Sequence, residues 1–125
     1  MTAGLSTTRA HAIINTYRAT SYTAVVPWLK LHTGDPGAAG TANASAETTR
    51  LQLSFAAPSG GSSAATEVVW EGWDAGSETI THCSVWSDET AGAFQESFAL
   101  AASKAVANSD DLAITVTVAF TPIAA

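Results

Sequence analysis

Apolar positions along the chain change their period near residue 20, from about 3.6 residues to 2. In the first part, four apolar residues recur at the spacing of one helical face; they are Ala10, Ile13, Ile14 and Tyr17. This predicts one short N-terminal helix over residues 6–18, with Ser6, Thr7 or Thr8 as its N-cap. A helix of this length needs a surface to pack against, because short helices are marginal on their own in water.

Beyond this segment, short runs of alternating apolar and polar residues predict about six or seven β-strands. The runs are residues 28–32, 50–55, 67–73, 79–86, 94–100 and 112–120. Polar turn signals rich in Gly, Asp, Asn and Ser separate them. The pattern favours a mainly β fold, an antiparallel β-sandwich of jelly-roll or immunoglobulin-like type, with the helix covering one edge or end. Length and the absence of a boundary indicate a single domain over residues 1–125.

The longest interruption between two predicted strands is the insert over residues 34–49. It begins with Gly-Asp-Pro-Gly at residues 34–37, and a glycine-rich loop can present backbone amides to a phosphate. A phosphate loop needs a following Lys and a helix, and neither is expected here. The stretch is therefore interpreted as a turn, in which Asp35 caps, Pro36 fixes φ and Gly37 accepts a positive φ. The rest of the insert is expected to be an extended loop or arm whose small side chains suit a contact with a neighbouring subunit.

Composition narrows the functional classes. Of the 125 residues, 46% are hydrophobic and 13% charged, and the low charge is typical of proteins that pack against other proteins. The net charge is −6, with nine acidic residues and only Lys104 as a base after Gly60, which argues against nucleic acid as a partner. No apolar run approaches the length of a membrane span, so no membrane partner is expected.

Candidate reaction centres are weak throughout the chain. His11, His32, His82 and Cys83 do not form a set with zinc-ligand spacing, and His82 and Cys83 are expected on opposite faces of one strand. The paired acids at 88–89 and 110–111 occur in turn-like contexts. No catalytic, cofactor-binding or metal-binding residue is predicted, so the chain is not expected to be an enzyme.

Surface aromatic residues give a better indication of function. If Leu29 and Leu31 point inward, then Trp28 is partly exposed beside Lys30 and His32, and such aromatics anchor interfaces or stack on sugars. A carbohydrate- or receptor-binding module is therefore one alternative. The residues predicted to form an interface are Trp28, Lys30, His32, Asp35, Pro36, Thr41 and Asn43.

Two long stretches resemble a family of small structural proteins of tailed bacteriophages. They are "LKLHTGDPGAAGTANASAETTRLQLSFAAPSGG" and the later "ETITHCSVWSDETAGAFQESFALAASKAVANSDDLAITVTV". The resemblance spans about residues 29–118, and Leu-His-Thr-Gly-Asp-Pro-Gly at residues 31–37 is its most specific part. Proteins of this kind are tail-fibre or minor tail proteins, and similar small sandwiches decorate capsids.

The resemblance implies a non-enzymatic virion component, most simply a minor tail or tail-fibre-associated protein, with capsid decoration as the alternative. Its partners would be other phage structural proteins, of the tail or the major capsid. Copies of the chain are expected to associate with one another, and a trimer is suggested only by analogy with other virion sandwiches. The expected location is the virion, assembled in the cytoplasm of the bacterial host.

Overall fold

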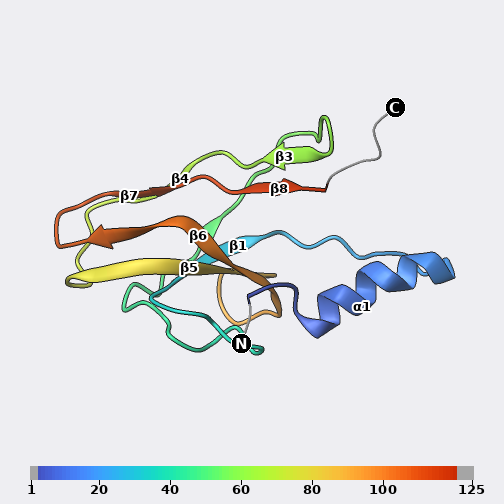
Figure 1. The fold of residues 1–125 in the computed structure, drawn as a ribbon, viewed down its shortest axis with the longest axis horizontal. Coiled ribbons are helices and arrows are strands. Elements are labelled where there is room, and N and C mark those ends of the chain that lie inside the picture. Colours follow the sequence, from blue (N-terminus) through green and yellow to red (C-terminus); the bar gives the residue numbers. More distant parts are fainter. Residues whose placement is uncertain (1–2, 121–125) are drawn as a thin grey trace.

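The computed structural model describes residues 3–120 and shows a mainly β fold with antiparallel sheets and one α-helix (Figure 1). The helical elements are α1 (Thr7–Asn15) and the 3₁₀ turn η1 (Thr16–Arg18). The strands are β1 (Trp28–His32), β2 (Leu51–Gln52), β3 (Ser62–Ala64), β4 (Val68–Trp70), β5 (Glu78–Trp86), β6 (Phe94–Val106), β7 (Leu112–Ile114) and β8 (Thr117–Ala119). The predicted fold class is confirmed.

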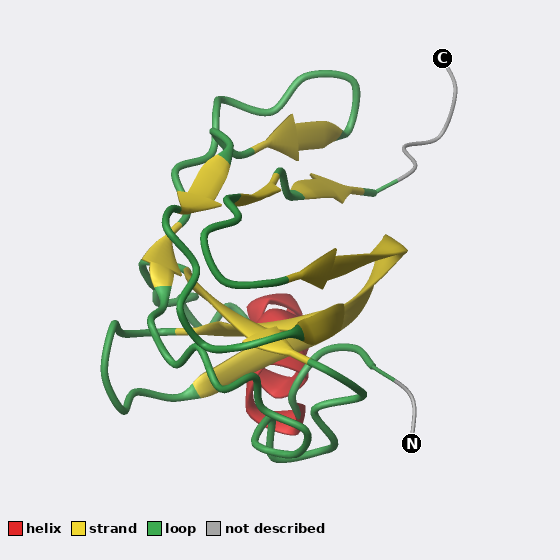
Figure 2. Cartoon of the chain, turned by 90° about the vertical axis from the view of Figure 1, so that its left-hand side faces the viewer, coloured by secondary structure: helices red, strands yellow, loops and turns green. Residues whose placement is uncertain are grey.

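The strands form two layers with the core between them. A four-stranded antiparallel sheet has the order β2-β1-β5-β6, and two separate ribbons pair β3 with β8 and β4 with β7 (Figure 2). Alternation along β1 turns Leu29 and Leu31 into the core, where each is fully buried. Trp70 on β4 and Ile114 on β7 belong to the same buried cluster, so the ribbons close the core from the other side.

The predicted strand over residues 112–120 is divided in two. Its first part, β7, pairs with β4, and its second part, β8, pairs with β3. The chain changes partner between them, and at this point the amide of Ala65 donates to the carbonyl of Val116 at 2.8 Å. β3 was not predicted, because its sequence Ser-Ser-Ala lacks the β-branched and aromatic residues that mark a strand.

β6 extends to Val106, beyond the predicted residues 94–100, and a bulge lies within it. Ile80 pairs with Lys104 and His82 with Ala99, so β6 advances five residues while β5 advances two. The extra residues include Leu100, which packs against the core while its neighbours remain exposed. Bulges of this kind distort an edge strand and protect it from pairing with other chains.

The N-terminal helix forms where it was predicted, but its apolar face is not covered. Ser6 is the N-cap, and its Oγ accepts a hydrogen bond from the Arg9 amide at 3.1 Å. No residue of α1 is buried, and Ile14 and Tyr17 are 59% and 91% exposed. The helix was expected to cover one edge or end of the fold; its Arg9 does reach Glu96 on β6, but this part of its apolar face remains exposed. Figure 1 shows why: α1 lies at one end of the molecule, beyond the ends of β1 and β5.

Candidate functional site

No reaction centre is visible in the described part of the chain. Among residues 3–120, no three His, Cys, Asp or Glu side chains gather closely enough to hold a metal ion. Cys83 is fully buried, and burial raises the pKa of its thiol to about 12. The thiol therefore stays protonated near neutral pH and is a poor nucleophile.

His32 was predicted to be part of an interface, but the structure buries it completely. Its Nδ1–H donates to the carbonyl of Ala42 at 2.9 Å, which makes Nε2 an acceptor for the Ser84 hydroxyl at 2.7 Å. The Ser84 oxygen in turn accepts the indole N–H of Trp86 at 2.8 Å. Burial lowers the pKa of His32 below its usual value, and every polar atom of this chain of contacts is paired in the neutral state.

The insert that follows β1 is a closed loop rather than an extended arm. The amide of Thr33 donates to the carbonyl of Asn43 at 2.9 Å, and the amide of Ser45 donates to the carbonyl of Leu31 at 3.1 Å. These two bonds bring both ends of the segment together beside β1. We refer to residues 33–45 as the closed loop.

Asp35, Pro36 and Gly37 form the predicted turn within the closed loop. The Gly37 amide donates to Oδ1 of Asp35 at 2.8 Å, and Gly37 has a φ of +74°. Asn43 donates its side-chain amide to the Asp35 carbonyl at 2.9 Å, which joins the two sides of the loop. The interpretation of this stretch as a turn is confirmed.

Gly40 allows the closed loop to lie directly on an aromatic pair. A Cβ atom at Gly40 would overlap the ring of Phe94, and the backbone has a φ of +73° there. The rings of Phe94 and Trp86 lie 5.6 Å apart, and the Arg50 guanidinium is stacked 4.4 Å from the centre of the Trp86 ring. The loop is therefore docked by shape as well as by hydrogen bonds.

Of the seven residues predicted to form an interface, three lie on β1 and four in the closed loop, with unequal access to solvent. His32 and Pro36 are buried, while Trp28, Lys30 and Asp35 are half-buried, and Thr41 and Asn43 are exposed. Burial and the nearby Arg50 charge lower the pKa of Lys30. Three of the four tryptophans, Trp70, Trp73 and Trp86, belong to the buried interior, which leaves Trp28 as the partly exposed one.

The second candidate surface is the segment that runs from α1 to the start of β1. We call residues 7–27 the N-terminal finger; none of them is buried. Several large apolar side chains on or beside it are exposed, namely Leu5, Ile13, Ile14, Tyr17, Tyr22, Val26 and Phe120. The helical period of the first residues was the signal for this surface, although that period predicted burial within the molecule.

A groove separates the finger from the β3–β8 ribbon. It consists of two adjoining hollows of about 370 and 310 Å³, and Arg9, Glu96 and Val118 line both of them. We call it the basal groove. Its larger hollow is lined mainly by apolar side chains, among them Val25, Pro27, Leu53, Phe55, Val85 and Val116.

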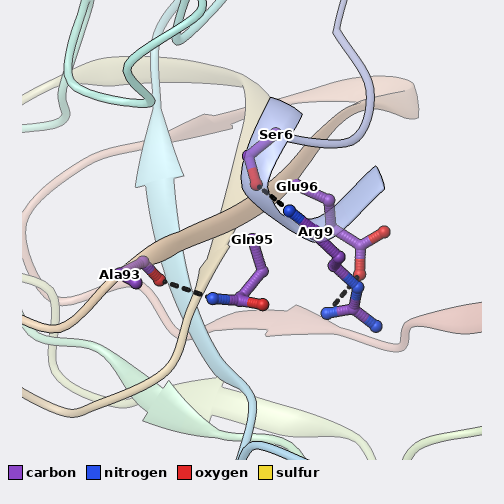
Figure 3. Close-up of polar contacts among 5 residues, drawn as sticks. All are labelled: Ser6, Arg9, Ala93, Gln95 and Glu96. Carbon is purple, nitrogen blue, oxygen red and sulfur yellow. Dashed lines mark hydrogen bonds and ion pairs between the residues drawn. The ribbon is translucent and has the colours of Figure 1, made fainter. Parts of the chain in front are cut away.

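One charged pair, Arg9 and Glu96, lines both hollows of the basal groove. The Arg9 guanidinium is 3.6 Å from the carboxylate of Glu96, and Figure 3 shows the two side chains next to the Ser6 cap. Nε of Arg9 is covered by protein atoms and finds no acceptor among residues 3–120. On the neighbouring part of β6, the Gln95 side chain is satisfied by the carbonyl of Ala93 at 3.1 Å (Figure 3).

A family model described as podophage GP4 fiber I protein gp80 matches residues 4–119, almost the whole chain. The chain belongs to this family. No curated protein matches it. Membership of the podophage fibre family confirms the resemblance to tailed-phage structural proteins at the level of the family and makes the chain a phage fibre-type structural protein of the virion. That residues 31–37 are the most specific part of the family pattern stays a prediction.

Fibre-type structural families are generally non-enzymatic. No helix within residues 3–120 has the length and apolar character to cross a membrane. For a podophage fibre protein, the question is therefore which of its surfaces contact other virion components, and the finger and the closed loop are the two candidates.

Proposed function

We propose that the chain is a non-enzymatic, tail-fibre-associated component of a podophage virion, and that it is held in the particle by burying the N-terminal finger against neighbouring virion proteins. Family membership supports the fibre-type role. The mode of attachment is supported by one observation above others, the uncovered apolar face of α1.

The uncovered helix argues for a partner on energetic grounds. α1 has nine residues, and helices shorter than about 12–15 residues are marginal in water without tertiary packing. Here the side chains that would supply such packing, Ile13, Ile14 and Tyr17, are exposed. Several exposed large apolar side chains within one short segment are typical of a protein contact. A partner that covers this face would stabilise the helix and remove the apolar surface from water.

The exposed rim of the closed loop is proposed as a second and more polar contact. Thr41 and Asn43 remain exposed, and Trp28, Lys30 and Asp35 keep part of their surface in solvent. These residues suit the polar margin of an interface better than its centre. A sugar-binding role has less support, because stacking on a sugar needs exposed aromatic faces and the other three tryptophans, Trp70, Trp73 and Trp86, are buried.

Quantitative mass spectrometry of purified virions tests this proposal. A fibre-associated protein is expected in a few copies per particle, with antibody labelling at the tail in electron micrographs. Many copies distributed over the head would show capsid decoration instead. Virions that lack the protein altogether would refute a structural role.

The mode of attachment is tested by phages that carry Ile14→Asp, with His11→Gln on another part of the same exposed helix as the matched control. The aspartate is expected to reduce incorporation into particles at least tenfold, because it places a charge in the contact. The control should be incorporated normally. Equal incorporation of both variants would show that the finger is not the attachment surface.

A further inference from the structure

We infer that the partner of the N-terminal finger is a second copy of this chain, whose basal groove receives the tip of the finger. The inference rests on the proposed function and identifies one neighbour of the finger. The contact is heterologous: a finger on one copy meets a groove on the next, so each copy offers one of each.

The tip of the finger has the form of a protruding apolar knob. Tyr17 in η1 is 91% exposed and Ile14 at the end of α1 is 59% exposed. Neither residue lines the larger hollow of its own basal groove. Both are therefore free to enter the groove of another molecule, and an aromatic side chain contributes 150–250 Å² of buried surface in such a contact.

The basal groove has the size and lining that this knob requires. Its larger hollow of about 370 Å³ is walled by Val25, Phe55 and Pro58, with buried Leu53 and Val85 at its floor. Water finds few hydrogen-bond partners in an apolar hollow of this kind. An apolar or aromatic side chain therefore binds there more favourably than water does.

One polar group in the groove favours tyrosine over other aromatics. Arg9 lines the groove, its side chain is 24% exposed, and its one ion pair among residues 3–120 is with Glu96 at 3.6 Å (Figure 3). A phenol oxygen can accept a hydrogen bond from a guanidinium, whereas a phenylalanine cannot. Tyr17 therefore matches both the apolar lining of the groove and the Arg9 guanidinium.

Charge distribution selects a finger-to-groove contact over a finger-to-finger contact. Residues 3–27 carry Arg9 and Arg18 and no acidic residue. Residues 46–120 carry ten acidic residues against two bases, Arg50 and Lys104. A finger that approaches the sheets of another copy is attracted, while two fingers packed face to face bring their Arg18 side chains together.

The oligomeric state of the full chain provides the first test. We expect wild-type protein to associate in analytical ultracentrifugation at micromolar concentrations. Tyr17→Ala should weaken this association at least about 30-fold, as expected for an aromatic anchor. Tyr17→Phe should have a smaller effect, since it retains the ring, and His11→Gln should have none. Circular dichroism would confirm that each variant is folded.

Directed cross-linking tests which surfaces meet. Tyr17→Cys protein and Ala56→Cys protein, mixed under mild oxidation, should form a disulfide-linked dimer, because Ala56 lines the groove and is exposed. The native Cys83 is buried and should not react. Tyr17→Cys mixed with Thr90→Cys, an exposed loop position, is the matched control and should give little product.

Three results would overturn the inference. The first is a wild-type protein that remains monomeric at about 100 µM, and the second is Tyr17→Cys protein that links to itself as readily as to the groove variant. The third is a monomeric protein whose incorporation into virions nevertheless depends on Tyr17, since the finger would then bind a different virion protein. In that case the proposed function stands and only the identity of the partner is wrong.

Discussion

The closed loop and the N-terminal finger flank the same strand, β1, and have opposite relations between composition and burial. The closed loop is rich in Gly, Ala, Thr and Asn, yet it is fixed on Phe94, with Pro36 and Gly40 buried. The finger carries Ile13, Ile14 and Tyr17, yet none of its residues is buried. The loop is held because its polar groups form hydrogen bonds and because Gly40 leaves room for the Phe94 ring beneath it. The finger has an apolar face without a matching surface, so its counterpart is expected on another molecule.

The largest effect on stability is expected where the closed loop touches the aromatic pair. Gly40→Ala would place a methyl group in the Phe94 ring and force alanine to a φ of +73°, at a cost of about 2–4 kcal/mol. Gly60→Ala is the matched control, because Gly60 has a φ of +58° with no atom within 4 Å of the added Cβ. Chemical denaturation should show a clearly smaller loss for the control, of about 1–2 kcal/mol. Equal losses would show that the loop is not held by this contact.

A somewhat smaller effect is expected inside the network beneath the loop. Ser84→Ala leaves the buried Trp86 indole N–H without an acceptor and His32 Nε2 without a donor, which costs about 1–3 kcal/mol. Ser54→Ala, at an exposed position, should change the free energy of unfolding by less than about 0.5 kcal/mol. A neutral Ser84→Ala variant would contradict the importance of the network.

The same network predicts a dependence of stability on pH. Burial, with Lys30 and His82 adding to it, lowers the pKa of His32 in the folded state below its usual value of 6.5. Between the folded pKa and pH 6.5, the unfolded chain therefore binds more protons than the folded chain. The contribution of neutral His32 to the free energy of unfolding is complete above pH 6.5. It is lost as the pH falls from there toward the folded pKa. Denaturation curves between pH 7.5 and 5 should show the decline.

His32→Gln is the variant that assigns this decline to one residue. It should be less stable at neutral pH, because the paired imidazole is lost, and its stability should fall less steeply below pH 6.5. An unchanged slope in the variant would assign the pH dependence to other groups.

The smallest effect on the isolated monomer is expected in the finger. Ile14→Ser replaces a side chain that is 59% exposed, so the free energy of unfolding of dilute protein should change by less than about 0.5 kcal/mol. The melting temperature of the wild type should rise with protein concentration through self-association, and that rise should be reduced in Ile14→Ser. A large loss of stability in dilute Ile14→Ser would mean that the finger packs on its own molecule.

Local pattern alone determined much of this protein. The alternation of residues 28–32 placed β1 and its inward Leu29 and Leu31, and the capping chemistry of Ser6 and the turn chemistry of Asp35 and Gly37 were also evident. These features depend on neighbours a few residues apart, so the sequence carries them directly.

Only the tertiary structure decided which of these segments are covered. The burial of His32 depends on Ser84, 52 residues away, and on a loop that closes back over β1. The division of residues 112–120 depends on which strand lies opposite each half. The helix shows the same limit of local pattern. Periodicity predicts that one of its faces is buried, but it cannot say whether the covering surface belongs to the same molecule. Burial is a property of two surfaces, and a local pattern describes only one of them.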